Sequence, residues 1–206
     1  MAKPKTAYVC TECGADYSKW QGQCTACQAW NTISEVRGVS SNSKGARGAR
    51  FEGFAGSLSG VQSLDDVSLA EQPRISSGMQ EFDRVLGGGL VEGSAVLMGG
   101  HPGAGKSTLL LQAVCHLAAT VPALYVTGEE SLQQVAMRAK RLGVENTAVN
   151  LASATSLRDI LATLKADKPD AVIIDSIQTL WSDALPAAPG TVTQVRACAQ
   201  ELVRFA

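Results

Sequence analysis

The chain has almost no net charge and no long apolar run. Its 18 basic and 19 acidic residues give a formal net charge of −1, so a nucleic-acid contact would need a local basic patch. No apolar stretch approaches the roughly 18 residues that a membrane-spanning helix needs. The N-terminus also lacks the apolar core that follows the first charges of a secretory signal. These absences predict a cytoplasmic location and no membrane partner.

Cysteine is scarce too, with 6 in 206 residues, but four of the six are tightly spaced. In a reducing cytoplasm such cysteines are more often metal ligands than disulfides. Two C-x-x-C turns ten residues apart direct four thiolates at one ion, the pattern of a tetrahedral zinc site. The paired spacing also argues against a single redox C-x-x-C. The predicted zinc ligands are Cys10, Cys13, Cys24 and Cys27.

The zinc site is expected to be structural rather than catalytic, because four protein ligands leave no open position on the ion. A segment of about 25 residues cannot bury a core of its own, so the metal supplies the folding energy. Charged and aromatic side chains around it offer a stacking surface for nucleic acid. A protein partner is equally compatible with them. These side chains are Lys3, Lys5, Lys19, Trp20 and Trp30.

Composition divides the chain into three regions. Residues 1–33 form the predicted zinc ribbon. Residues 34–60 are rich in Gly, Ser and Ala, lack apolar periodicity and carry several basic residues, which predicts a flexible basic linker able to contact DNA. Residues 61–206 contain the periodic segments of a folded domain. The linker's basic residues are Arg37, Lys44, Arg47 and Arg50.

Within residues 61–206, apolar runs alternate with helical patterns. Strands are predicted at 95–99, 123–127, 148–152 and 171–175. Helices are predicted at 76–86, 106–119, 131–142 and 156–166, and from about Thr191 onward, with Ser76-Ser77, Ser131 and Ser156 as N-terminal caps. This alternation predicts an α/β fold with a parallel sheet covered by helices on both faces.

A phosphate-binding loop stands between the first predicted strand and its helix. The loop fits G-x-x-x-x-G-K-[ST] at every fixed position. A glycine turn before a helix N-terminus surrounds an anion with backbone N–H groups. Lys106 is expected to reach the outer phosphates of a nucleoside triphosphate and the Ser107 hydroxyl to bind magnesium. The nucleotide-binding residues are Gly100, His101, Pro102, Gly103, Ala104, Gly105, Lys106, Ser107 and Thr108.

Acidic residues follow two of the predicted strands. Asp175 ends an apolar strand, as does the aspartate that holds magnesium through water in this class of ATPase. Glu129 and Glu130 follow the strand 123–127, and all strand C-termini of such a sheet open on the ligand crevice. Glu129 is predicted to activate the attacking water, and Glu130 to favour the next helix N-terminus through its dipole. The alternative is that both glutamates only favour the N-terminus of the next helix through its dipole. Gln178 is either a γ-phosphate sensor or an ordinary loop amide.

The order of these motifs resembles the bacterial RadA (Sms) family of RecA-like DNA repair ATPases. The matching segments are the four-cysteine ribbon, the stretch from Arg74 to Gly78, Glu81 to Leu90, the phosphate loop, Gly-Glu-Glu-Ser and Ile-Ile-Asp-Ser-Ile-Gln-Thr. The resemblance implies a hexameric DNA-dependent ATPase that processes branched recombination intermediates on single-stranded DNA. It also implies recombinase or helicase partners, and places the first DNA-facing loop at 181–193. His101 stands where aspartate is expected.

Two features of the family are missing from the 206 residues. These are a Lys-Asn-Arg-Phe-Gly motif and a Lon-protease-like domain, and the last helical pattern stops without a cap. We therefore expect a truncated chain with an incomplete sheet, weak turnover and no closed hexamer. A nucleotide-dependent signalling switch with a RecA fold and a ribbon-anchored interaction module are the alternative functions.

Overall fold

A computed structural model describes residues 6–37, 63, 65 and 73–206. The chain separates into two compact units, Met1–Glu71 and Gln72–Ala206. Most of the predicted linker, from residue 38 to residue 60, lies outside the described residues, and the domain limits 1–33, 34–60 and 61–206 stay predictions. No helix in the described part of the chain is long and apolar enough to cross a membrane.

The first unit is a small antiparallel sheet with two cysteine turns. Strand β1 (Thr6–Cys10) lies between β2 (Asp16–Tyr17) and β3 (Ile33–Arg37). Each turn closes with a backbone hydrogen bond, from Gly14 N–H to the Cys10 carbonyl and from Gln28 N–H to the Cys24 carbonyl. Among the described residues of this unit, the buried apolar ones are two of the cysteines and Ile33. Such a core is too small to fold a domain, which agrees with a metal-dependent fold.

The second unit contains a parallel sheet of three strands in the order β7-β6-β8. Strand β6 (Ala123–Thr127) is central, between β7 (Asn150–Ser153) and β8 (Ala171–Asp175). The strands at 123–127 and 171–175 are confirmed residue for residue, and β7 starts two residues later than predicted. Side chains of β6 alternate between two separate apolar clusters, as the pleat of a strand requires.

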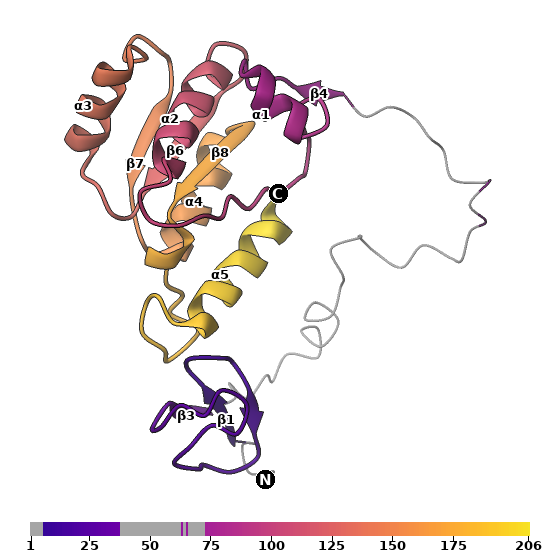
Figure 1. Ribbon diagram of the computed structural model, residues 1–206, viewed down its shortest axis with the longest axis vertical. Helices are drawn as coiled ribbons and strands as arrows, with labels where there is room; N and C mark the ends of the chain where they lie inside the picture. Colours follow the sequence, from indigo (N-terminus) through magenta and orange to yellow (C-terminus); the bar gives the residue numbers. More distant parts are fainter. Residues whose placement is uncertain (1–5, 38–62, 64, 66–72) are drawn as a thin grey trace. The chain divides into compact units, whose positions relative to one another are not determined.

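Helices cover both faces of this sheet (Figure 1). Helices α2 (Lys106–Leu117) and α3 (Leu132–Leu142) pack with Tyr125 on one face. Helices α4 (Leu157–Asp167) and α5 (Val192–Phe205) pack with Leu124 and Val126 on the other. The fold is therefore an α/β arrangement with helices on both faces of a parallel sheet, as predicted.

Helices α3 and α4 begin at their predicted caps, and α5 begins after Thr191, the predicted start of the last helix. The hydroxyls of Ser131, Ser156 and Thr191 each accept a hydrogen bond from the backbone N–H three residues on, and so satisfy an N–H that has no partner within the helix. Gln134 completes a capping box with Ser131, and Gly143 ends α3 with a left-handed conformation.

The strand predicted at 95–99 is wrong. Residues 94–100 have no regular secondary structure, and Val96 and Leu97 are 53% and 84% exposed. A strand exists through ladder hydrogen bonds to a neighbour. Within the described residues β6 pairs with β7 and β8, and no strand pairs with residues 95–99. An apolar run alone could not reveal that missing partner.

The segment before the phosphate loop forms a compact turn that was only partly predicted. Strand β4 (Arg74–Ile75) pairs antiparallel with β5 (Leu90–Val91) around helix α1 (Gln80–Val85). The cap predicted at Ser76-Ser77 is wrong, because α1 begins after Met79 and these serines instead bind Asp83. Glycine is required at position 89, where φ is +129° and a Cβ would lie 2.6 Å from the Ile75 carbonyl oxygen.

Candidate nucleotide and zinc sites

The phosphate loop is an exposed turn that leads directly into α2. Gly103 and Gly105 have φ of +79° and +82°, a conformation open to glycine, and Gly105 is the residue before the helix. The Lys106 ammonium donates to the carbonyl oxygens of Gly100 (2.8 Å) and His101 (2.9 Å). It is thereby held over its own loop, where an incoming phosphate can replace these carbonyls as acceptor. Ser107 and Thr108 lie in the first turn of α2.

The predicted acids lie at one edge of the sheet. Thr127 and Asp175 are paired in the parallel ladder, so β6 and β8 end together. Glu129 follows β6 by two residues, and its Oε1 accepts a 2.7 Å hydrogen bond from the hydroxyl of Ser176, directly after β8. The structure thus brings Glu129 beside the end of the strand that carries Asp175, as the topology predicted.

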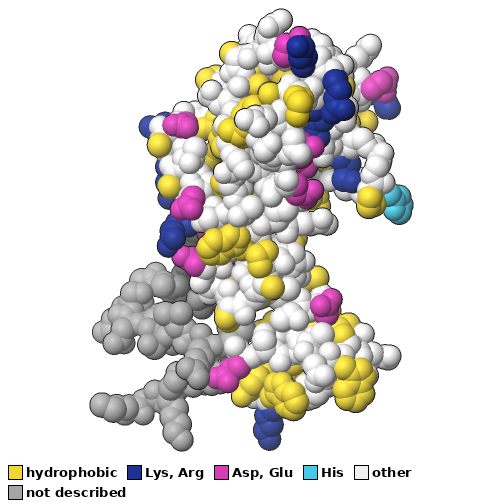
Figure 2. All heavy atoms as spheres, turned by 90° about the vertical axis from the view of Figure 1, so that its left-hand side faces the viewer, with side chains coloured by type: hydrophobic (Ala, Val, Ile, Leu, Met, Phe, Trp, Pro, Cys, Tyr) yellow, Lys and Arg dark blue, Asp and Glu magenta, His cyan; other side chains and the backbone are white. Residues whose placement is uncertain are grey.

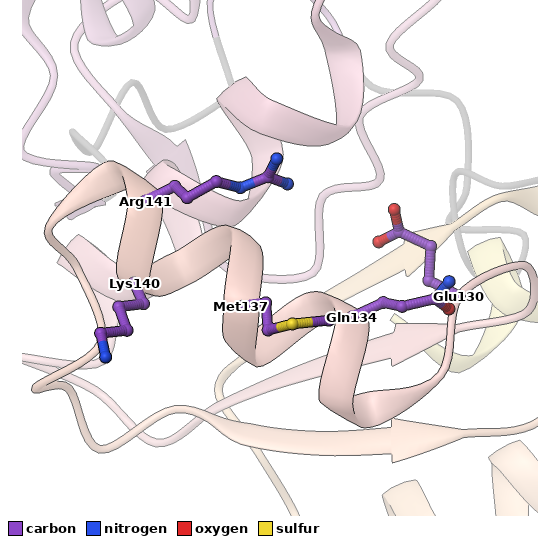
Figure 3. A pocket seen from close by; sticks show the side chains of 5 residues that line it. All are labelled: Glu130, Gln134, Met137, Lys140 and Arg141. Atoms are coloured by element: carbon purple, nitrogen blue, oxygen red, sulfur yellow. The ribbon is translucent and has the colours of Figure 1, made fainter.

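Glu130 has a different environment from its neighbour. Its Oε2 lies 2.9 Å from Nη2 of Arg138 on α3, in an ion pair in which the Arg138 side chain is only 13% exposed. The Thr127 hydroxyl also accepts a hydrogen bond from the Glu130 N–H and donates one to the Glu130 carbonyl. In Figure 3 the Glu130 carboxylate faces a shallow hollow beside α3, which is also lined by Gln134, Met137, Lys140 and Arg141. Glu130 is therefore engaged with α3.

Asp175 has a buried partner that sequence analysis missed. The Tyr125 hydroxyl, on β6, donates to Asp175 Oδ2 at 2.5 Å and accepts from Arg138 at 3.0 Å. Burial, together with this carboxylate, raises the pKa of Tyr125, so the phenol keeps its proton. A tyrosine within a strand is usually an apolar residue of the core. The sequence signal that could have indicated this contact is the position of Tyr125, two residues before the end of β6, the strand that pairs with the strand of Asp175.

The phosphate loop and the predicted acids of the nucleotide site are not joined by direct polar contacts. Within the described residues no hydrogen bond or ion pair joins the phosphate loop to Asp175 or Glu129. Helix α2, which begins at the loop, packs against β6 and β8. The Gln178 side chain, on the short 3-10 helix η2 (Ile177–Thr179), has no hydrogen bond within the described residues either.

The four predicted zinc ligands lie together. Their sulfur atoms are all within 4.8 Å of one another. Sulfurs bound to one tetrahedral zinc ion at 2.3 Å are about 3.8 Å apart. The Cys10–Cys27 and Cys13–Cys24 pairs, at 3.7 and 3.5 Å, fit that spacing. The donor set and its geometry therefore suit a structural zinc ion.

Neighbouring hydroxyls favour the thiolate form of two of these ligands, Cys10 and Cys24. The Tyr17 hydroxyl lies 3.0 Å from the Cys24 sulfur and lowers the pKa of that thiol to about 6. Thr32 Oγ1 lies 3.2 Å from the Cys10 sulfur. Zinc binds thiolate rather than thiol, and outer hydrogen bonds of this kind orient metal ligands.

The ribbon also exposes two tryptophans. Trp20 and Trp30 are 58% and 69% exposed. A Cβ added to Gly22 would lie 3.8 Å from the Trp30 ring and 3.9 Å from the Trp20 ring, so the two indoles flank one glycine. Apolar side chains gather on the ribbon surface in Figure 2. This cluster, Trp20 with Trp30, is the exposed aromatic surface expected from the sequence.

Fold and sites together define the class: a RecA-like P-loop ATPase domain preceded by a four-cysteine zinc ribbon. Comparison with protein families agrees. Residues 75–154 match the ATPase family of KaiC, and residues 8–35 match the rubredoxin metal binding domain. Among solved structures, flagellar accessory protein FlaH from Methanocaldococcus jannaschii is 20% identical, with a TM-score of 0.46 over 66% of this chain and 67% of its own.

Comparison with individual proteins is more specific. The chain is 56% identical to DNA repair protein RadA of Haemophilus influenzae, 57% to that of Salmonella typhimurium and 56% to that of Escherichia coli. Each match covers 100% of this chain and 45% of the relative. The chain is thus a homologue of RadA along its whole length, which confirms the resemblance predicted from its motifs, and it spans 45% of the length of these relatives.

Proposed function

We propose that this chain is the nucleotide-hydrolysing part of a DNA repair ATPase. The observation that carries the proposal is the combination of a complete phosphate loop with acids at the ends of two adjacent strands. It occurs in a chain homologous to DNA repair proteins along its whole length. The finer function is ATP-driven processing of branched recombination intermediates on single-stranded DNA, in the cytoplasm.

Each catalytic role follows from chemistry at its position. Lys106 and the N–H groups at the start of α2 stabilise the charge of the transferring phosphoryl group. A serine hydroxyl and a carboxylate are the oxygen ligands that magnesium prefers, so Ser107 and Asp175 suit a magnesium ion, which neutralises phosphate charge when bound. Glu129 takes the proton of the attacking water.

The choice of Glu129 over Glu130 rests on their partners. Glu129 accepts one hydrogen bond from a serine, which leaves lone pairs for a water molecule. Glu130 is paired with the largely buried guanidinium of Arg138, and moving it would leave that charge without its partner. A base must be free to accept a proton, so Glu129 is the better candidate.

A DNA partner is supported by the ribbon surface as well as by the relatives' names. The exposed rings of Trp20 and Trp30 can stack on unpaired bases, with Lys19 beside them in sequence for a phosphate. Residues 181–193 are the second proposed DNA contact. A homo-hexamer, with recombinase or helicase partners, is the assembly expected of a full-length family member, rather than of these 206 residues alone.

The decisive experiment measures ATP turnover with and without single-stranded DNA. We expect DNA to stimulate turnover, and Lys106→Ala to abolish it. Glu129→Gln should retain ATP binding while turnover falls by about 10²-fold or more, because only the base is lost. Glu130→Gln, the same chemical change one residue away, is the variant that separates the two acids. An inactive Glu130→Gln beside an active Glu129→Gln would reverse the assignment.

The match of residues 75–154 to the KaiC ATPase family supports one competing function, a nucleotide-dependent signalling switch. ATP binding with slow turnover that DNA does not stimulate would favour the switch. A chain that binds no ATP would favour the third candidate, an interaction module anchored by the ribbon.

A further inference from the structure

A hydrogen-bonded network buried beneath the sheet edge links Asp175 to helix α3. Hydrogen bonds run from Asp175 to Tyr125 on β6 and from Tyr125 to Arg138 on α3, and an ion pair joins Arg138 to Glu130. Tyr125 is 0% exposed, and the side chains of Arg138 and Asp175 are 13% and 19% exposed. Burying polar groups is unfavourable unless they are hydrogen-bonded, and here Arg138 Nε and Glu130 Oε2 are buried with no hydrogen-bond partner among the described residues. Such an arrangement at a candidate magnesium ligand calls for a functional explanation.

The two oxygens of the Asp175 carboxylate are not equivalent. Oδ2 accepts the Tyr125 hydroxyl at 2.5 Å and has the Arg138 guanidinium 3.9 Å away. Within the described residues no donor is bonded to Oδ1. The hydrogen bond to Oδ2 restricts rotation of the carboxylate about its Cβ–Cγ bond. Oδ1 is left available to another partner.

We propose that Tyr125 is a positioning residue, which fixes the Asp175 carboxylate so that Oδ1 is presented to a hydrated magnesium ion. The inference rests on the proposed function, because it takes Asp175 as a magnesium residue. Arg138 acts one step further out. A hydroxyl that accepts from a guanidinium has its own hydrogen free to donate elsewhere, so Arg138 directs the Tyr125 O–H toward Asp175. Glu130 in turn holds Arg138.

This arrangement explains why the adjacent glutamates differ. Glu130 is the outer end of the network that supports Asp175, whereas Glu129 is bonded to Ser176 outside it. At this edge of the sheet, Glu130 therefore supports the metal ligand and Glu129 activates water. Hydrogen bonds to metal-ligating carboxylates commonly affect metal affinity by 10- to 100-fold.

The test compares nucleotide binding with and without magnesium and needs no turnover. The quantity is the ratio of the Kd of a fluorescent, non-hydrolysable ATP analogue in EDTA to its Kd in magnesium. Tyr125→Phe removes one hydroxyl and keeps the ring, and should lower this ratio by about tenfold, with little change of the Kd in EDTA. Tyr8→Phe, the same change in the ribbon, should leave the ratio as in wild type.

Arg138→Met provides a second variant and the more stringent test. Arg138 is bonded to the Tyr125 hydroxyl at 3.0 Å and is farther from Asp175, at 3.9 Å, so its main effect passes through that hydroxyl. The double variant should therefore lose no more than about twofold beyond Tyr125→Phe alone. If the two substitutions acted independently, their fold-losses in the Kd ratio would multiply in the double variant. If Tyr125→Phe failed to fold, a wild-type ratio in Arg138→Met would overturn the proposal.

The possible failures are distinguishable. A wild-type chain whose ATP affinity did not depend on magnesium would contradict the proposed function. A normal wild-type ratio together with an unchanged ratio in Tyr125→Phe would contradict only the positioning role. The positioning role would also be overturned if the double variant lowered the Kd ratio by the product of the two single-variant factors.

Discussion

At the scale of single residues, position in the hydrogen-bond network decides what an acid does. Asp83 illustrates this away from the candidate active site. Its Oδ2 accepts the Ser76 hydroxyl at 2.6 Å and its Oδ1 accepts the Ser77 N–H at 2.8 Å. These bonds fix the segment between β4 and α1. Asp83 is a structural residue that pattern analysis had placed only within a family motif.

Asp83 gives a pH prediction. The hydrogen bonds from Ser76 and Ser77 hold the pKa of Asp83 below its ordinary value of 3.8. Because the folded pKa is lowered, the stabilisation is complete above pH 3.8 and is lost as the pH falls through the folded value. Amide exchange at Ser77, corrected for its intrinsic pH dependence, should therefore be constant from pH 7 to pH 5 and accelerate below pH 3.8.

Asp83→Asn is the matched variant, since it keeps one acceptor and loses the charge. Its Ser77 amide should exchange roughly five- to tenfold faster at pH 6, because hydrogen bonds to charged acceptors are stronger by about 1 kcal/mol. Its corrected exchange should then show no acceleration below pH 3.8. Equal exchange of the two proteins at pH 6 would contradict this account.

At the scale of elements, the sequence predicts what is determined locally. Helices α3, α4 and α5 begin at capping residues whose hydrogen bonds span three residues, so a short stretch of sequence contains the signal. Strands β6 and β8 are continuous apolar runs bounded by turn residues. Residues 95–99 have the same composition, yet a strand depends on a distant partner that composition does not encode. The same limit applies to Tyr125, whose role comes from Asp175 fifty residues away.

The junction after β6 gives an element-scale prediction. A Cβ on Gly128 would overlap Thr179 Oγ1 and lie 2.9 Å from Thr179 Cβ, on the short helix η2 that follows β8. Gly128→Ala must therefore push the ends of β6 and β8 apart and should destabilise the unit by about 1–3 kcal/mol. Gly99→Ala is the control, because a Cβ there has nothing within 4 Å. Urea denaturation followed by circular dichroism compares the two, and equal midpoints would show that η2 adapts without cost.

At the scale of the whole molecule, the chain joins units that are stabilised by different means. The unit Gln72–Ala206 has apolar clusters on both faces of its sheet, and all helices of the described residues belong to it. The ribbon has a minimal apolar core and four cysteines. Sequence spacing was enough to predict the four ligands, because each C-x-x-C turn fixes two sulfurs locally. It could not predict Tyr17 and Thr32, whose contacts with the sulfurs arise only when the sheet forms.

Loss of one zinc ligand should therefore unfold one unit and spare the other. Cys24→Ser should reduce bound zinc from one ion per chain to none and change the fluorescence of Trp20 and Trp30, since metal binding supplies the ribbon's folding energy. The helical circular dichroism of the second unit should remain. Cys115→Ser is the matched control: this cysteine is buried in α2, outside the metal cluster, and the variant should retain zinc while lowering the stability of the second unit. Full zinc occupancy in Cys24→Ser would contradict the four-cysteine site, and loss of the helical signal would contradict the independence of the two units.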